Sequence, residues 1–354
     1  MHMTIFSIVT ALTALIIPKL MRMFKYKLIL VTSVIIAVIS TGMMAYSNDI
    51  YVFYLLGAIR GFSTGLFSIV PLTIIINGWF HKHHGLATSI VFGFSGLAGA
   101  ICSPIFSSCI EKFGWNTGYI IEAGIILFLC LPAIIYPFEI SATKEGLSPL
   151  GYEDDVKVEK KLNKNNDRVY TTIALICFCI FALINTTVTG ITQHLPSFAE
   201  TMGYGILLGS SLLSSGMVGN VVSKLIIGTM SDKVGPVKSS ITMIIMNTIG
   251  IILIIVSKEP RMLIIGSFLF GFVYSVGAVG IPLLTKYLFG IDNYARIFPI
   301  ISFLSNIGTA LSLSIVGYIY DFTSSYKIAF FIAIGINMIC LALIMFIIKN
   351  KKDY

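Results

Sequence analysis

Charged side chains are scarce in this sequence. Only 11% of its 354 residues are Asp, Glu, Lys or Arg, whereas a soluble globular domain carries roughly 25%. So few charges cannot cover a water-exposed surface, and hydrophobic residues make up 56% of the chain. A soluble domain is therefore excluded, and the natural unit of the chain is a membrane span of about 20 apolar residues.

Residues that carry catalytic chemistry are also few. No Gly-x-x-x-x-Gly-Lys-[Ser/Thr] phosphate loop is present, so the chain does not hydrolyse ATP. The apolar segments hold almost no His, Asp or Glu, which a membrane enzyme would need to bring together. His81, His83 and His84 share a loop without Cys or an acidic neighbour, so we expect no metal site and no cofactor. Nucleic-acid binding is excluded because no basic stretch is interleaved with aromatic residues.

Long apolar segments alternate with short polar ones along the whole chain. Backbone groups in lipid must be hydrogen-bonded within their own segment, so these segments are helices. Their apolar residues do not alternate with polar ones, which excludes a membrane β-barrel. We therefore expect an all-α integral membrane protein with 11 transmembrane helices, at 4–18, 27–47, 51–78, 85–110, 117–138, 169–193, 204–229, 238–257, 261–285, 295–319 and 327–348.

The Lys and Arg residues are distributed unevenly over the connecting segments. Eighteen of the 24 fall in alternate connections, four in the others, and Arg60 and Lys224 lie inside helices. Basic residues accumulate on the cytoplasmic side of membrane proteins. This predicts a multi-pass protein of a cell membrane with its C-terminus in the cytoplasm and, for 11 spans, an N-terminus outside.

The two halves of the sequence are related by a shift of 210 residues, which places Gly61 on Gly271 and Glu111 on Asp321. We expect an N-terminal bundle at 1–138, a flexible cytoplasmic linker at 139–168 and a C-terminal six-helix bundle at 169–354. The helix at 169–193 has no partner under this shift, so the first bundle has five helices. We expect that a first helix and about 40 residues are missing, by a start-site error or a real truncation.

Several motifs resemble those of the major facilitator superfamily. Gly228-x-x-x-Asp232-Lys233-x-Gly235 resembles its signature loop, and in the first-half copy Arg22 replaces the acidic residue. Arg60-Gly61-x-x-x-Gly65 resembles its fourth-helix basic motif. The segment from Gly78 to Ala87 is similar to the oxalate/formate antiporter and monocarboxylate transporter branch, as are His194-Leu195-Pro196 and Gly317–Asp321.

This resemblance implies a two-bundle fold and a monomeric secondary transporter that works by alternating access. It implies a small solute as substrate, and the branch suggests an organic anion such as a mono- or dicarboxylate. Coupling to protons or to a counter-anion stays open. The alternatives are a different small solute, or a truncated remnant that no longer transports.

Two basic residues inside helices are candidates for binding an anion. Arg60 lies near the middle of its span, where a charge costs roughly 2.5–3.5 kcal/mol, so it either binds solute or bonds to neighbouring helices. Lys224 matches the place where related carboxylate transporters carry a basic residue in the eighth helix. It either faces the cavity or extends to the cytoplasmic surface. Glu122 could take up protons or lie at the interface.

Uncharged polar residues supply the remaining candidates. Asn185, Thr189 and Gln193 are spaced by four and would share one helix face, which lines either a cavity or a helix contact. Asn306 is a candidate of the same kind. Tyr274 either lines the cavity or packs between helices.

Overall fold

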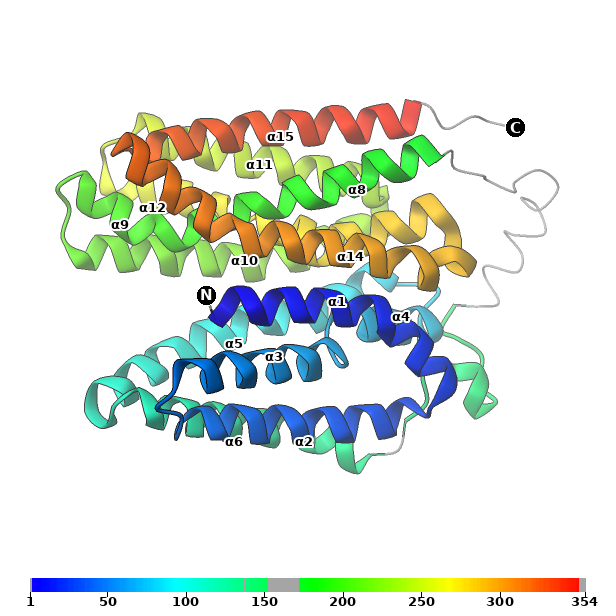
Figure 1. The fold of residues 1–354 in the computed structure, drawn as a ribbon. Helices are drawn as coiled ribbons and strands as arrows, with labels where there is room; N and C mark the ends of the chain where they lie inside the picture. The colour runs from blue at the N-terminus through cyan, green and yellow to red at the C-terminus, as the bar shows by residue number, and fades with distance from the viewer. Residues whose placement is uncertain (1, 137, 152–171, 350–354) are drawn as a thin grey trace.

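The computed structural model describes residues 2–136, 138–151 and 172–349. Regular elements in these residues are helices, and one isolated β-bridge joins Phe80 to Leu150. Figure 1 shows two layers of helices, α1–α6 and α8–α15, that run along one common axis. The fold is all-α and built from two bundles, as the sequence predicted.

The first bundle consists of six helices joined by short turns. Asp49 begins α3 by accepting a hydrogen bond from the backbone N–H of Tyr51 at 2.7 Å, and Gly114, with φ 83°, separates α5 from α6. The helices are α1 (His2–Met23), α2 (Tyr26–Met44), α3 (Ile50–Gly65), α4 (Ile69–Trp79), α5 (His84–Phe113) and α6 (Trp115–Ile135).

The second bundle has more breaks within its helices. Its elements are α8 (Thr172–Thr187), η2 (Val188–His194), α9 (Leu195–Thr201), α10 (Ile206–Val234), α11 (Pro236–Val256), α12 (Pro260–Phe270), α13 (Val273–Ser275), η3 (Val276–Gly280), α14 (Ile281–Thr323) and α15 (Tyr326–Lys349).

Helix α14 contains parts of two membrane crossings. The helical run Pro260–Thr323 has 64 residues and would extend about 96 Å, whereas a bilayer core is about 30 Å thick. Gly290, with φ 76° and ψ 170°, turns the chain back within this run. The described residues hold nine helical runs that are long and apolar enough to cross a membrane. With the division at Gly290, and with the 30 residues of α5, these runs accommodate the eleven predicted crossings.

The helix bounds confirm the shift of 210 residues between the halves. Helices α2 and α11 begin at Tyr26 and Pro236, and α3 and α12 begin at Ile50 and Pro260. Likewise α5 ends at Phe113 and α14 at Thr323. The two halves therefore have the same sequence of turns.

Corresponding crossings of the two halves are also broken at corresponding places. Helix α3 ends at Gly65, and three residues separate it from α4, although the sequence predicted one span over 51–78. In the second half, the corresponding crossing is interrupted after Phe270 and includes the π-helical segment η3. Interrupted helices at matching positions of two repeats mark the region where transporters bind their solute.

We name the two ends of the bundles by their connections. The linker end holds the turn between α1 and α2, residues 138–151 and Lys349, and the far end holds the turns at Gly114, Ser257 and Ser324 (Figure 1). Residues 139–151 are attached to the first bundle rather than free, because Leu150 N donates to Trp79 O and Trp79 Nε1 donates to Glu139 O, each at 2.9 Å. The linker predicted at 139–168 stays a prediction: its first part packs on the first bundle, and residues 152–168 lie outside the described residues.

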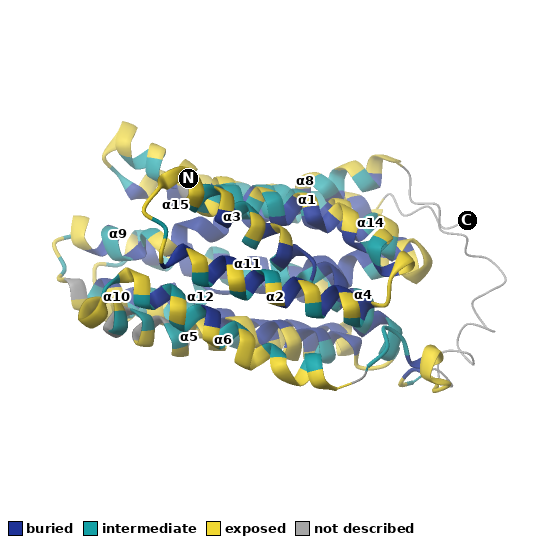
Figure 2. Ribbon diagram, turned by 60° about the horizontal axis from the view of Figure 1, so that its bottom comes forward, coloured by how far each residue is buried: buried dark blue, intermediate teal, exposed yellow. Residues whose placement is uncertain are grey.

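Burial follows the pattern of a membrane protein rather than that of a soluble one. Many large apolar side chains face outward, such as Phe128, Leu129 and Phe331, at 72%, 63% and 59% exposure. Figure 2 shows buried residues concentrated where helices face one another and exposed ones on the outer surfaces. Lipid would cover these outer surfaces.

Candidate functional site

The two bundles meet where α5 crosses α10 and where α1 crosses α14. Lys224 of α10 lies at the first crossing, and its ammonium nitrogen donates to the carbonyl oxygen of Phe92 at 3.2 Å and to Ser95 Oγ at 2.8 Å. Only 3% of Lys224 is exposed. Lys224 is therefore turned onto the other bundle and does not extend to the surface. It lies about 15 Å from the end of α10 at Val234.

No carboxylate balances this charge within the described residues. The one ion pair found there joins Arg60 to Glu122, in a different part of the molecule. An ammonium has three N–H donors, of which Lys224 uses two, so one donor is left for another acceptor. An anion bound at this donor would offset the cost of holding a charge in an apolar surrounding.

Arg60 has a partner inside its own bundle. Arg60 Nη2 of α3 donates to Glu122 Oε1 of α6, and the guanidinium carbon lies 5.4 Å from the ring centroid of Phe6 in α1. The two charged side chains are 14% and 30% exposed. Each charge thus neutralises the other, which favours the structural interpretation of Arg60.

A second polar group forms where two interrupted crossings of the second bundle meet. Tyr274, in α13, donates its hydroxyl hydrogen to the carbonyl oxygen of Thr189 in η2 at 3.3 Å. The side chains of Thr192 and Gln193 lie beside the same hydroxyl. The structure therefore brings the predicted residues Tyr274, Thr189 and Gln193 together.

Asn185 does not belong to this group. The spacing of four predicted one shared face for Asn185, Thr189 and Gln193, but the α-helix ends at Thr187 and a 3₁₀ segment follows. A 3₁₀ helix repeats every three residues, so the spacing of four no longer aligns side chains. Asn185 is 1% exposed and lies against Cys340 of α15, whereas Gln193 is exposed.

Asn306 is half-buried on α14, in the part that packs along α8. Its neighbour Ser305 accepts a hydrogen bond from Thr186 at its carbonyl oxygen, at 2.9 Å. Asn306 therefore lies beside the first crossing of the second bundle, separate from the contacts of Lys224.

The signature loop ties the bundles together at the linker end. The two carboxylate oxygens of Asp232 accept hydrogen bonds from the backbone N–H groups of Gly85 and Leu86 at 2.8 and 2.9 Å. These groups begin α5, where a helix carries a partial positive charge. Gly228 allows this approach, because a Cβ there would collide with the Gly85 carbonyl oxygen and with Ser89 Oγ.

The other two members of the loop have local roles. Gly235 has φ 90°, which favours glycine, and it separates α10 from α11. Lys233 is exposed in the last turn of α10, where a positive charge is favourable.

Comparison with known proteins decides the family. The family model described as Major Facilitator Superfamily matches residues 1–219 and, in a second alignment, residues 209–353. The chain belongs to the major facilitator superfamily.

Curated relatives of this superfamily member are transporters. It is 23% identical over 335 residues to monocarboxylate transporter 12 of Xenopus laevis, covering 88% of this chain and 72% of that protein. It is 21% identical over 247 residues to the sialic acid transporter NanX of Escherichia coli, covering 69% and 58%.

Solved structures show the same fold. The human organic anion transporter MFSD10 matches with a TM-score of 0.71 at 14% identity, over 96% of this chain and 82% of the other. The major facilitator transporter FucP in its outward conformation matches with 0.70 at 13% identity, over 98% and 89%. These structures show the fold alone. The family model and the curated relatives identify the chain as a multi-pass secondary transporter of small solutes and not an enzyme.

Sequence reasoning missed the partners of Lys224 in this transporter. Ser95 and the Phe92 carbonyl lie on α5, and Asn220 lies one turn from Lys224 on the same side of α10, with its Oδ1 buried and unpartnered. The i, i+4 spacing of Asn220 and Lys224 is a signal that could have placed both on one face.

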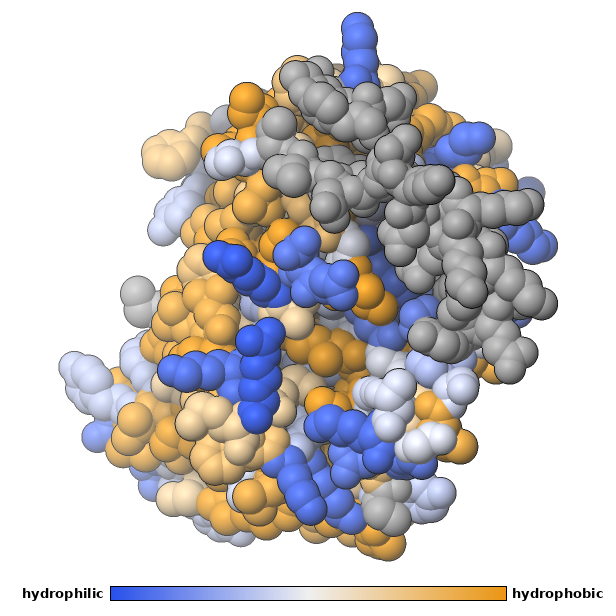
Figure 3. Space-filling model, turned by 90° about the vertical axis from the view of Figure 1, so that its right-hand side faces the viewer, coloured by the Kyte–Doolittle hydropathy of each residue, from blue (hydrophilic) through white to orange (hydrophobic). Residues whose placement is uncertain are grey.

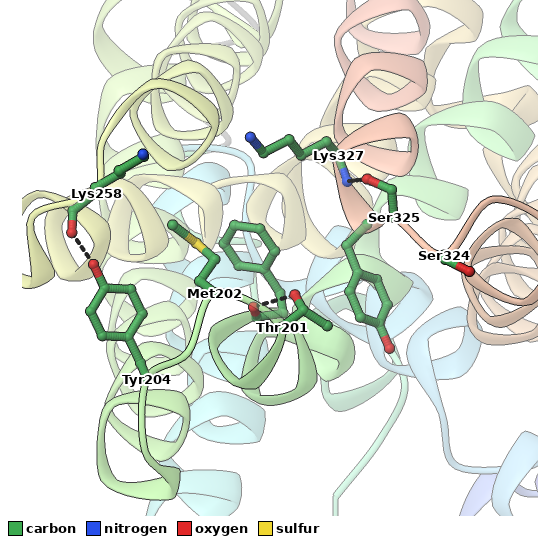
Figure 4. Close-up of a pocket in the computed structure, with 9 residues that line it drawn as sticks. Thr201, Met202, Tyr204, Lys258, Ser324, Ser325 and Lys327 are labelled. Carbon is green, nitrogen blue, oxygen red and sulfur yellow. Dashed lines mark hydrogen bonds between the residues drawn. The ribbon is translucent and has the colours of Figure 1, made fainter.

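The far end carries a separate pocket of about 330 Å³, lined entirely by the second half of the transporter. Figure 4 shows Lys258 and Lys327 extending toward each other over it, with Thr201 and Met202 beneath. The hydroxyl of Tyr204 donates to the Lys258 carbonyl oxygen. Because this pocket lies within one bundle, it does not belong to the site between the bundles.

Proposed function

We propose that this transporter carries a small organic anion, such as a mono- or dicarboxylate, by alternating access, and that Lys224 holds the anion. The observation that supports this proposal is the buried ammonium of Lys224, which has no carboxylate partner among the described residues and lies between the two bundles. Relatives named as monocarboxylate, sialic acid and organic anion transporters support the substrate class.

The neutral part of the substrate would be bound by the second bundle. Tyr274, Thr189 and Gln193 offer hydroxyl and amide groups at the two helix interruptions. The two hydroxyl oxygens can accept from a solute hydroxyl, because their hydrogens go to backbone carbonyls, and the Gln193 amide can donate and accept, all without adding charge. Asn306 would serve the same purpose from α14.

The linker end is the cytoplasmic end in this proposal. The uneven distribution of Lys and Arg residues supports this orientation, which also places the C-terminus in the cytoplasm of a cell membrane. Here Asp232 and Gly228 hold α10 against the start of α5. We therefore interpret the structure as closed toward the cytoplasm, so that solute would enter a monomeric transporter from the far end.

Coupling by exchange of anions fits Lys224 best. A single ammonium can hold the outgoing and the incoming anion in turn, and this needs no titrating carboxylate. Proton coupling would need Glu122 to give up Arg60, its partner in the present structure. A pH gradient would then drive uptake, whereas exchange requires an anion loaded on the opposite side.

The test is uptake of radiolabelled mono- and dicarboxylates into liposomes that contain the purified chain. We expect saturable uptake of at least one of them, its loss in Lys224→Gln, and normal uptake in the control Lys112→Gln, which also removes one charge. Liposomes preloaded with unlabelled anion or given a pH gradient distinguish the two modes of coupling. Equal uptake by Lys224→Gln and the unchanged chain would contradict the proposal.

A further inference from the structure

A cavity of about 410 Å³ opens at the linker end of the first bundle. Its walls are the turn between α1 and α2 and the segment that follows α6. The lining residues that matter here are Arg22, Phe24, Lys25, Glu139 and Lys144. The residues that line this cavity all belong to the first half and none to α5 or α10, so the cavity is separate from the contacts of Lys224.

Positive charge dominates this cavity, which we call the basic pocket. Three of its lining side chains, Arg22, Lys25 and Lys144, are cationic, and Glu139 is the one acidic side chain among those that line it. None of the three cations forms a side-chain hydrogen bond or an ion pair with another described residue. The basic pocket thus carries an excess of two positive charges, which suits a phosphate group.

Exposed apolar side chains adjoin the basic pocket. Met23 and Phe24 line it and are 62% and 51% exposed, and Ile135, at the end of α6, is 72% exposed. Figure 3 views the molecule from this end and shows hydrophilic residues, in blue, interspersed with a hydrophobic surface, in orange. Cationic groups next to exposed apolar ones fit a ligand that has both a phosphate and acyl chains.

The repeat shows that the fold does not require this charge. Arg22 occupies the position of Asp232 in the second half, and Lys25 that of Gly235, under the shift of 210 residues. The second half therefore has an acidic residue that bonds to α5, whereas the first half has cations that bond to no described residue.

We propose that the basic pocket binds the phosphate headgroup of an anionic phospholipid from the leaflet at the linker end. The acyl chains of this lipid would lie along Met23, Phe24 and Ile135. A lipid bound there would contact both the α1–α2 turn and the segment that follows α6. It would therefore hold these two parts of the first bundle together. This proposal is independent of the solute that Lys224 binds.

The test measures lipid binding to the purified full chain by native mass spectrometry, with phosphatidylglycerol and phosphatidylcholine as probes. The variant Arg22→Gln/Lys144→Gln removes two charges from the basic pocket. Its control, Lys238→Gln/Lys349→Gln, removes two exposed charges from the same end but outside the pocket. Circular dichroism and thermal melting check that both variants fold.

We expect the chain to prefer phosphatidylglycerol, with about a tenfold weaker affinity in the pocket variant and no change in the control. Inorganic phosphate in millimolar excess should compete only weakly, since it lacks acyl chains. Equal losses in both variants, or an unchanged preference in the pocket variant, would overturn the proposal. Binding of inorganic phosphate as tightly as the lipid would also overturn it, in favour of a site for free anions.

Discussion

The two halves share one architecture but use their charged residues differently. In the first half, Arg60 and Glu122 neutralise each other inside one bundle. In the second half, Lys224 and Asp232 both bond to α5, which belongs to the other bundle. The comparison teaches that a charge shared between the bundles and a charge neutralised inside one bundle have different consequences. Changes at the contact of Lys224 with Ser95 should affect transport, whereas changes to the ion pair of Arg60 with Glu122 should affect stability.

The largest expected effect tests the second half of this comparison. We expect Lys224→Gln to lower the rate of anion uptake about a hundredfold, because a buried charge interaction contributes about 2–5 kcal/mol. Thermal melting should be unchanged or slightly higher, since an unbalanced charge has been removed. Lys224→Arg, which keeps the charge, should retain part of the uptake. A large fall in melting temperature for Lys224→Gln would contradict the assignment.

The next largest effect tests the ion pair of Arg60 with Glu122 in the first half. Arg60→Gln leaves Glu122 without its partner, and we expect a loss of about 2 kcal/mol in stability. The double variant Arg60→Gln/Glu122→Gln should recover most of it, because neither charge is left alone. Thermal melting of the unchanged chain and the two variants measures this. If the double variant folds well but no longer takes up anions, then the ion pair has a role in transport.

A smaller effect concerns the close approach of the bundles. We expect Gly228→Ala to disfavour the present structure by about 1–2 kcal/mol, since the new Cβ would meet Gly85 and Ser89. Hydrogen exchange at the first turn of α5 should then be faster. Gly124→Ala is the control, because a Cβ at Gly124 has no atom within 4 Å. Similar exchange in the two variants would show that the contact is unimportant.

The smallest effect is expected for Asp232→Asn. An amide still accepts one hydrogen bond, but the charge that favours a helix start is lost, which is worth about 1 kcal/mol. Hydrogen exchange of Gly85 and Leu86 should therefore increase less than in Gly228→Ala. A larger increase would mean that the charge, and not the close approach, holds the bundles together.

The fold could be predicted from the sequence because apolar length and basic connections follow from the bilayer itself. The shift of 210 residues predicted the matching turns at Tyr26 and Pro236. The breaks inside crossings could not be seen, because Leu66 and Val276 continue the apolar pattern on both sides. The same limit applies to the predicted helix at 169–193. Its apolar pattern continues past Thr187, where the structure changes to a 3₁₀ segment.

Individual candidate residues could be found, but not their partners. A charge within an apolar run marks Arg60 and Lys224 equally. Which of them is balanced depends on the contact of α3 with α6 and of α10 with α5, and both contacts join positions far apart in the chain. The difference between the two cations is thus a property of the packing.

The most direct test of the unbalanced charge is to supply a partner within the protein. Ser95 Oγ lies 2.8 Å from the Lys224 ammonium, so Ser95→Asp places a carboxylate beside the charge that would bind the anion and neutralises it. We expect a higher melting temperature and loss of anion uptake, while the uncharged Ser95→Asn keeps most of the uptake. Undiminished uptake by Ser95→Asp would show that Lys224 does not hold the transported anion.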